Sequence, residues 1–288
     1  RLVDYTLQRH YPEHLGSERP ALALLDAVIE RQAHLIAQWM RVGFIHGVMN
    51  TDNMTLCGET IDYGPCAFMD AYDPATVFSS IDHGRRYAFG NQPPVAQWNL
   101  ARLAEALLPA IDDDPDKALE LAEQSIERFS ALYERAQLQT MRAKLGLLGE
   151  EDNDAALVRD FLDWMKRRRA DYTGSFRMLC AGAEGPQPLQ PDEELTAWHS
   201  RWRERLERNP GGQAAAWPVM HAANPVYIAR NHRVEEALAA ATGPAADLKP
   251  LHRLLEVLRS PYDERAEFFD YTTPAPDGGR GYQTFCGT

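Results

Sequence analysis

The sequence contains little cysteine, and its cysteines are widely spaced. The 288 residues include four cysteines, and no two of them form a C-x-x-C pair. A cysteine-rich zinc site is therefore not expected, and reduced thiols are the default. No apolar run reaches the ~18 residues that a membrane-spanning helix needs, and the first residues lack the basic-then-apolar pattern of a signal peptide. We expect a cytoplasmic protein without a membrane partner.

Positive charge is also scarce. Lys and Arg number 30 against 42 Asp and Glu, which gives a net charge of −12. A general nucleic-acid-binding protein needs a basic surplus to neutralise phosphates, so nucleic acid is not an expected partner. A small nucleotide remains compatible with this charge, because a metal ion can neutralise its phosphates.

Helical periodicity dominates what is present. Apolar residues recur at three- and four-residue steps from Ala21 to Arg41, which predicts an amphipathic helix. Two short strands around Cys57-Gly58-Glu59 predict a β-hairpin, and a long loop follows it. The expected fold class is mainly α with one small β-hairpin. Further helices are expected over residues 95–108, 116–145, 152–172, 192–207, 225–241 and 251–259, strands over 54–56 and 60–63, a loop over 64–94, and linkers over 182–191 and 274–281.

One segment concentrates polar side chains. The loop after the first expected helix holds His46, Asn50, Asp52 and Asn53, and Asp62 ends the second expected strand. A hairpin folds its two ends together, so Asn53 and Asp62 should lie close in space. An amide oxygen and a carboxylate are hard ligands suited to Mg²⁺ or Mn²⁺. Such an ion would hold the phosphates of a nucleotide.

The order of these parts resembles the catalytic loop and D-F-G segment of protein kinases and aminoglycoside-type kinases. His46-Gly47 matches the start of the catalytic loop, Asn53 matches its metal-binding Asn, and Ile61–Gly64 matches the D-F-G segment. Val48 stands where those kinases place the catalytic Asp, and a valine cannot accept a proton. By the ordinary kinase template, the chain would be a pseudokinase.

The complete string is more specific, and it resembles the selenoprotein O family. The resemblance covers nearly the whole chain. Its motifs are residues 46–54 (HGVMNTDNM), 61–65 (IDYGP), 68–74 (FMDAYDP), 86–93 (RYAFGNQP), 98–100 (WNL), 224–225 (NP), 228–232 (IARNH) and the C-terminal Cys286.

The resemblance implies a protein adenylyltransferase of kinase-like fold, which transfers AMP from ATP to Ser, Thr or Tyr hydroxyls of proteins. It implies that Asp52 is the proton acceptor, that Asn53 is a metal ligand, and that Asp62 is a metal ligand which also contacts ATP. Residues 1–110 would form a kinase-like C-lobe core, and residues 111–288 a helical extension with a redox tail. Family members also carry an N-terminal lobe that holds ATP, and this chain lacks its motifs, so we expect the chain alone to be inactive.

The resemblance also implies a redox feature. Bacterial relatives are expected to join their C-terminal cysteine to a cysteine beside the D-Y-G segment, and Cys286 and Cys66 occupy those places. Cys57 and Cys180 are expected to be inert thiols.

Several of these residues also have a purely structural interpretation. His46 would brace its loop, and Asp52 would be an ordinary turn residue. Arg85, Arg86 and Arg230 would either contact an anionic ligand or stand in solvent. The basic run at residues 166–169 suits the end of a helix, and the six tryptophans are expected to pack in the core.

Two other functions compete with AMP transfer. The first is a non-catalytic helical interaction module derived from a kinase-like fold. The second is a small-molecule kinase of the aminoglycoside type, against which Val48 argues.

Overall fold

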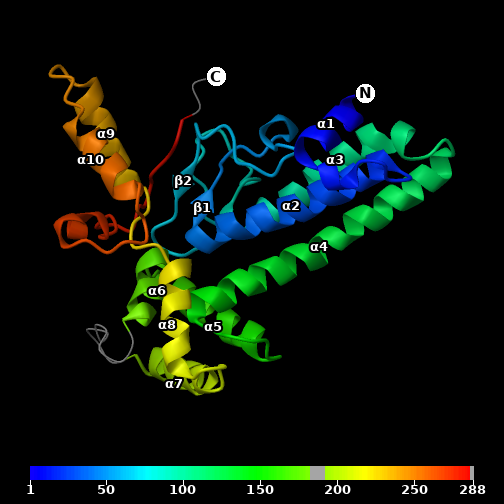
Figure 1. Ribbon diagram of the computed structural model, residues 1–288. Coiled ribbons are helices and arrows are strands. Elements are labelled where there is room, and N and C mark those ends of the chain that lie inside the picture. Colours follow the sequence, from blue (N-terminus) through cyan, green and yellow to red (C-terminus); the bar gives the residue numbers. More distant parts are fainter. Residues whose placement is uncertain (182–191, 286–288) are drawn as a thin grey trace.

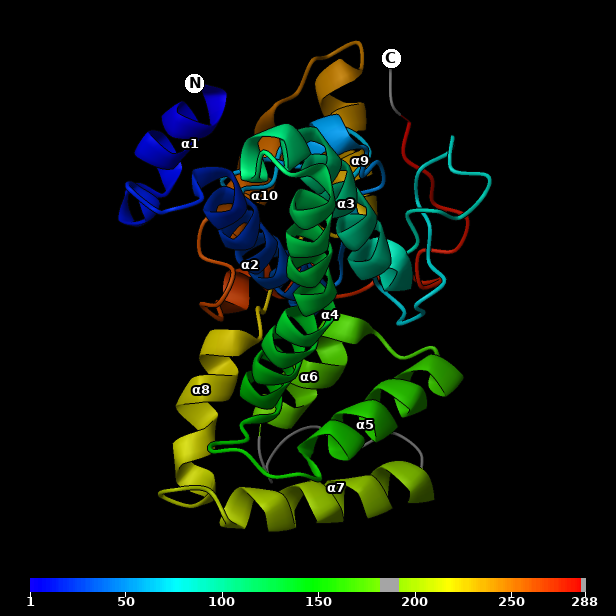
Figure 2. The same cartoon turned by 90° about the vertical axis from the view of Figure 1, so that its right-hand side faces the viewer.

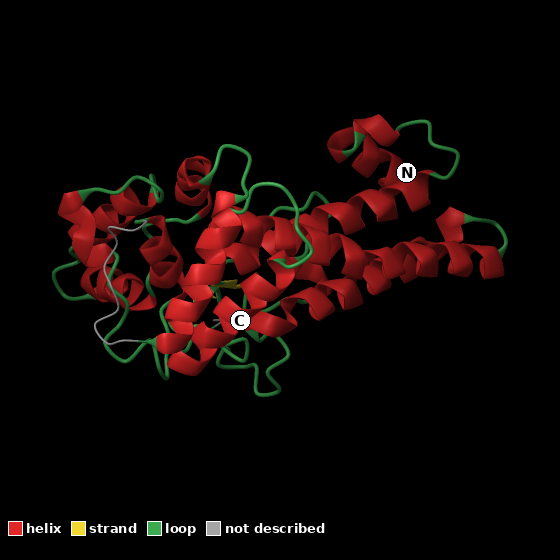
Figure 3. Ribbon diagram, turned by 90° about the horizontal axis from the view of Figure 1, so that it is seen from below, coloured by secondary structure: helices red, strands yellow, loops and turns green. Residues whose placement is uncertain are grey.

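The computed structural model describes residues 1–181 and 192–285, and helices dominate it (Figure 3). Three long helices form its central layer: α2 (Pro20–Val42), α3 (Gln92–Ile111) and α4 (Pro115–Leu145). They run side by side in Figure 1, and each packs against the other two. A short helix, α1 (Leu2–His10), precedes them and contacts α2.

Local sequence signals explain where the long helices begin and end. Pro20 and Pro115 occupy first-turn positions, where the missing N–H costs no hydrogen bond. The Asp114 side chain caps α4 by accepting from the Asp116 N–H at 3.0 Å. Gly43 and Gly146 end α2 and α4 in the left-handed conformation, with φ of +73° and +70°.

A second group of helices gathers at the C-terminal end of α4 (Figure 2). It comprises α5 (Asp154–Arg168), α6 (Tyr172–Cys180), α7 (Glu193–Glu207) and α8 (Ala216–Ala223). Aromatic rings hold it together, since Phe161 stacks on Trp198 at 4.3 Å and the Trp202 indole donates to the Leu145 carbonyl at 2.8 Å. The pair α9 (Asn231–Thr242) and α10 (Lys249–Leu258) lies apart from this group and packs on itself.

The sheet in the described residues has two strands and lies where the sequence predicted none. β1 (Phe44–Ile45) pairs antiparallel with β2 (Ala67–Phe68), in the register Phe44–Phe68 and Ile45–Ala67. The expected hairpin over 54–63 is reduced to one bridge, between Met54 and Thr60. The small antiparallel sheet is therefore confirmed as a feature, and its predicted position is wrong.

Side chains replace the backbone ladder of that expected hairpin. The Thr55 hydroxyl donates to the Glu59 carbonyl at 2.7 Å and accepts from the Glu59 N–H at 2.9 Å. The Gln32 amide donates to the Thr55 carbonyl at 2.7 Å, and the Tyr11 hydroxyl donates to the Leu56 carbonyl. Backbone groups occupied in this way are not available for a second strand.

Two helices are also shorter than predicted. The predicted helix over 152–172 ends at Arg168, because Arg169 adopts a left-handed φ of +51°, and Asp171 then caps α6. The predicted helix over 225–241 begins only at Asn231. Residues 225–230 are not helical, since the Val226 and Tyr227 N–H groups both donate to the Pro261 carbonyl. The helices α1, α6 and α8 were not predicted. The linker over 182–191 lies outside the described residues.

Tryptophan burial follows the prediction at five positions and departs from it at one. Trp39, Trp164, Trp198 and Trp202 are buried, and Trp217 packs against the core. Trp98 is 46% exposed and lies between the guanidinium groups of Arg86 and Arg102, at 4.6 and 5.1 Å. It serves as a cation–π platform on the surface of α3.

The core contains one buried lysine without an acidic partner. Lys144 is 1% exposed, and its ammonium group lies 4.0 Å from the Phe176 ring centroid. No carboxylate in the described part of the chain lies within ion-pair distance of it. Burial, with a smaller contribution from nearby Arg41, holds the pKa of Lys144 well below its usual value.

Replacing Lys144 by Met should therefore stabilise the fold, by about 1–3 kcal/mol at pH 7. Between the lowered native pKa and the ordinary value, the unfolded chain binds the extra proton, so the Lys144 contribution to stability rises with pH. Urea unfolding at pH 7 and pH 9 should show a smaller stability rise in the variant than in the parent. The exposed Lys166→Met variant is the control, and an equal rise in all three proteins would contradict the prediction.

Candidate functional site

The polar loop begins where β1 ends, and His46 holds it in place. His46 is fully buried, and its backbone N–H donates to the Gln92 side chain at 3.0 Å. Its Nδ1 accepts from the Val48 N–H at 3.4 Å, so Nε2 carries the proton and donates to the Ile61 carbonyl at 2.9 Å. Burial lowers the pKa of His46, which agrees with this neutral form. His46 is a brace between the loop and the segment ending at Asp62, as its structural interpretation predicted.

Asn53 is oriented by the same loop. It closes a short 3-10 helix, Thr51–Asn53, and its side-chain Nδ2 donates to the Val48 carbonyl at 3.0 Å. This contact fixes which end of the amide faces the loop, and Oδ1 has no hydrogen-bond partner in the described part of the chain. The side chain is half-buried, which limits the rotamers that it can adopt.

Asp62 has an unusual backbone conformation. Its φ is +54°, one of four left-handed non-glycine residues in the described chain. The carboxylate is exposed and has no hydrogen-bond partner among the described residues. Because the Ile61 carbonyl is held by His46, the left-handed turn presents Asp62 to solvent at a defined point.

The Met54–Thr60 bridge brings the two segments side by side. Asn53 lies one residue before the bridge and Asp62 two residues after it. Asp52 is exposed and adjoins Asn53 in the same 3-10 turn. No cluster of three His, Cys, Asp or Glu side chains suited to a metal occurs in residues 1–181 and 192–285. A site of one amide and one carboxylate suits an ion whose other ligands are water and phosphate, as Mg²⁺ commonly has.

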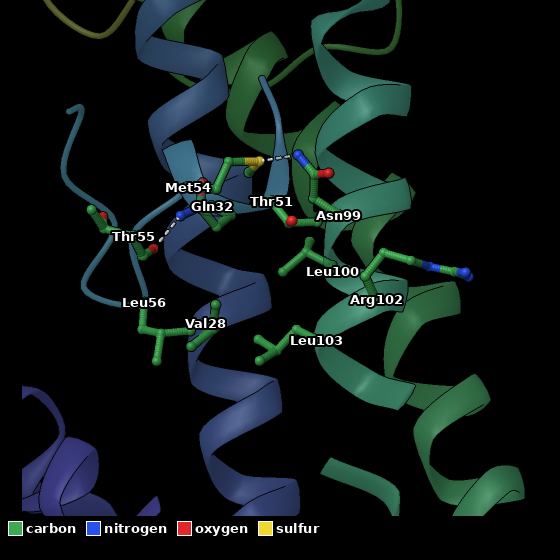
Figure 4. A pocket seen from close by; sticks show the side chains of 10 residues that line it. All are labelled: Val28, Gln32, Thr51, Met54, Thr55, Leu56, Asn99, Leu100, Arg102 and Leu103. Atoms are coloured by element: carbon green, nitrogen blue, oxygen red, sulfur yellow. Dashed lines mark hydrogen bonds between the residues drawn. The ribbon is translucent and has the colours of Figure 1, made fainter. Parts of the chain in front are cut away.

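A cavity of about 240 Å³ lies behind this loop, between α2 and α3 (Figure 4). Gln32 from α2 and Asn99 from α3 reach across it to the loop backbone. The Asn99 amide donates to the Met49 carbonyl at 2.9 Å, as Gln32 does to Thr55. Both helices thus hold the backbone that presents Asp52 and Asn53. Gln32, Gln92 and Asn99 were not predicted from the sequence to have these roles.

The C-terminal segment runs beside Cys66. The Thr284 hydroxyl donates to the Pro65 carbonyl at 2.7 Å, and Thr284 bridges Ser79. Cys66 is half-buried, and burial raises the pKa of its thiol to about 11. Cys286 lies outside the described residues, so a bridge to Cys66 stays a prediction. No two of the described cysteines, Cys57, Cys66 and Cys180, are joined.

The three loop arginines fall into different environments. Arg86 stacks on Trp98, and Arg85 stands in solvent. The prediction that Arg230 contacts a ligand or stands in solvent is wrong. Arg230 is 1% exposed and forms ion pairs with Asp70 and Asp171. The basic run at 166–169 ends α5 as predicted, and Arg168 pairs with Asp192.

Comparison with known proteins gives consistent matches along the chain. The family described as protein adenylyltransferase SelO matches residues 1–259. Proteins named protein nucleotidyltransferase YdiU match the whole chain. They include one from Syntrophotalea carbinolica at 52% identity, covering 58% of that protein, one from Cereibacter sphaeroides at 54%, covering 59%, and one from Brevibacillus brevis at 54%, covering 58%. The chain thus spans less than two thirds of these relatives. No described helix is long and apolar enough to cross a membrane.

Proposed function

The chain belongs to the protein adenylyltransferase SelO family, and on this premise we propose that it carries the metal ligands and proton acceptor of a protein AMP-transferase. The observation that carries the proposal is the orientation of Asn53 and Asp62. The amide of Asn53 is fixed through its nitrogen, and Asp62 is turned outward by a left-handed residue on a histidine-braced segment. These observations support two oxygen ligands on segments joined by the Met54–Thr60 bridge.

In this proposal Asn53 Oδ1 and the Asp62 carboxylate would hold Mg²⁺ or Mn²⁺. The ion, when bound, neutralises charge on the phosphates of ATP. Asp52 accepts the proton of a Ser, Thr or Tyr hydroxyl on a protein substrate. The hydroxyl oxygen forms a bond to the α-phosphorus, the bond from that phosphorus to the bridging oxygen breaks, and diphosphate leaves. His46 is neutral and takes no part in the proton transfer.

The kinase-like fold, the division into residues 1–110 and 111–288, and the Cys66–Cys286 bridge belong to the same proposal. Thr284 on the Pro65 carbonyl supports the bridge, because it brings the described end of the chain to the segment that contains Cys66. Such a bridge would tie the tail to the loop that presents Asp62.

The test compares ATP labelled at the α-phosphate with ATP labelled at the γ-phosphate, with Mn²⁺ and bulk bacterial protein as acceptor. We expect this chain, joined to the N-terminal lobe of a curated relative, to transfer the α-label and not the γ-label. The 288-residue chain alone should transfer neither. Transfer of the γ-label would indicate a kinase. A folded joined protein that transfers neither label would favour the helical interaction module.

A further inference from the structure

A polar pocket of about 300 Å³ lies between the loop after β2 and the C-terminal segment. Its walls are the start of the loop after β2 and residues 278–283, which we call the tail strap. Thr284, which directly follows the strap, bridges Ser79 of the loop, and the C-terminal segment and the loop lie side by side in Figures 1 and 2. The tail continues to Thr284, which contacts Pro65, so the pocket adjoins the candidate site without sharing its residues.

Three arginines line this pocket: Arg85 from the loop, Arg169 from the end of α5 and Arg280 from the strap. Their guanidinium groups have neither an ion pair nor a hydrogen bond with any residue in the described ranges. All three side chains are exposed. A second arginine-rich pocket is lined by Arg201, Arg205 and Arg208, and each of these pairs with an Asp or Glu.

The backbone of the pocket favours an anion as well. In the strap, the N–H groups of Arg280 and Gly281 donate to nothing within the described residues. Free N–H groups in a glycine-rich turn are common donors to phosphate oxygens.

The acidic residues of the lining leave a positive balance. Asp70 is buried, and Arg230 pairs with it. Asp73 accepts the Ala75 N–H at 2.9 Å and has no cationic partner among the described residues. Three free arginines therefore face one free carboxylate in a chain whose net charge is −12. Guanidinium groups bind phosphate oxygens through paired hydrogen bonds, which a carboxylate-rich surface would not offer.

We propose that this pocket binds a small phosphate-bearing anion, either inorganic or esterified, through Arg85, Arg169 and Arg280. This site is separate from the metal site at Asn53 and Asp62, and it does not depend on the proposed AMP transfer.

The test is calorimetric titration of the 288-residue chain with inorganic phosphate, diphosphate and glycerol phosphate, in buffer without divalent metal. Binding of phosphate or diphosphate would indicate a free inorganic anion as the ligand, and binding of glycerol phosphate would indicate a phosphate ester. Replacing any one of the three arginines by Gln should weaken binding by about 10-fold or more. Arg135→Gln is the matched control, because Arg135 is an exposed arginine of α4 outside every described pocket.

The site would be supported if at least one probe binds the parent, binds the three pocket variants more weakly, and binds Arg135→Gln with unchanged affinity. Absence of binding for all three probes would overturn it. An equal loss in the control would also overturn it, because it would indicate general charge attraction. Circular dichroism of each variant checks the fold, and these exposed substitutions should leave the spectrum unchanged.

Discussion

Replacing Asp62 by Asn should lower α-label transfer by the joined protein about 10³-fold, because the metal would lose its charged ligand. Loss of partners that only orient a ligand already costs about 10–100-fold, and loss of the ligand itself should cost more. The same variant should bind Mn²⁺ more weakly, as measured by electron paramagnetic resonance titration. Because Asp62 is exposed and makes no hydrogen bond to the described residues, the unfolding midpoint of the Asp62→Asn protein should differ little from that of the parent.

The Asp52→Asn variant separates proton acceptance from metal binding. It should lower transfer by about 10²–10⁴-fold, as expected for a lost general base, while Mn²⁺ binding stays at the parent value. Asp113→Asn is the matched control, because Asp113 is an exposed aspartate in the turn before α4. Unchanged transfer in Asp62→Asn would refute its assignment as a metal ligand. Loss of Mn²⁺ binding in Asp52→Asn would contradict its role as a proton acceptor alone.

Asp62→Gly adds a test of the backbone. Glycine adopts a φ of +54° without steric cost, so this variant should be at least as stable as the parent. It should nevertheless transfer no measurable label. A protein that gains stability and loses activity would show that the left-handed Asp62 is retained for its carboxylate.

Periodicity predicted the long helices well because their apolar faces are continuous. α2 was expected over 21–41 and runs from Pro20 to Val42, and α4 was expected over 116–145 and runs from Pro115 to Leu145. Periodicity did not predict helix ends that depend on the backbone conformation of a single residue. The left-handed Arg169 divides an apolar pattern that otherwise continues from α5 into α6, and no glycine marks the position.

The motif likewise predicted the candidate site residues but not their supports. His46, Asn53 and Asp62 stand within 17 positions, so their order in the sequence reveals them. Gln32, Gln92 and Asn99 come from helices outside the loop, and only the tertiary fold brings their amide groups to the loop backbone. Asn99 stands in the WNL motif at 98–100, but neither the motif nor helical periodicity showed that its side chain is buried against Met49.

Arg230 carries the largest expected effect on stability. Its guanidinium pairs with Asp70 and with Asp171, and its Nη2 also donates to the Thr272 carbonyl at 2.9 Å. Asp70 accepts the Ala275 N–H at 3.2 Å, and its carbonyl accepts from Tyr172 at 2.7 Å. One buried group therefore joins the loop after β2, the start of α6 and the C-terminal segment.

Replacing Arg230 by Met should lower the free energy of unfolding by about 3–5 kcal/mol, because it leaves the Asp70 carboxylate buried and unpaired. The free energy of unfolding of Arg230→Lys should lie between those of the parent and Arg230→Met, since an ammonium group keeps the charge but lacks the planar, two-pronged geometry of a guanidinium. Urea unfolding at pH 7 provides the measurement. A loss below about 1 kcal/mol in Arg230→Met would contradict the prediction, because it would mean that these ion pairs contribute no more than exposed surface pairs.

The matched control adds Asp70→Asn to Arg230→Met. Removing both charges should recover part of the lost stability, because the penalty comes from the unpaired carboxylate rather than from the missing contacts. Arg201→Met, which breaks an exposed pair with Asp160, should cost less than about 1 kcal/mol. Limited proteolysis tests the wider consequence. Thr272 loses its Arg230 donor in Arg230→Met, and Asp70, which accepts the Ala275 N–H, loses its partner, so cleavage should begin in the C-terminal segment.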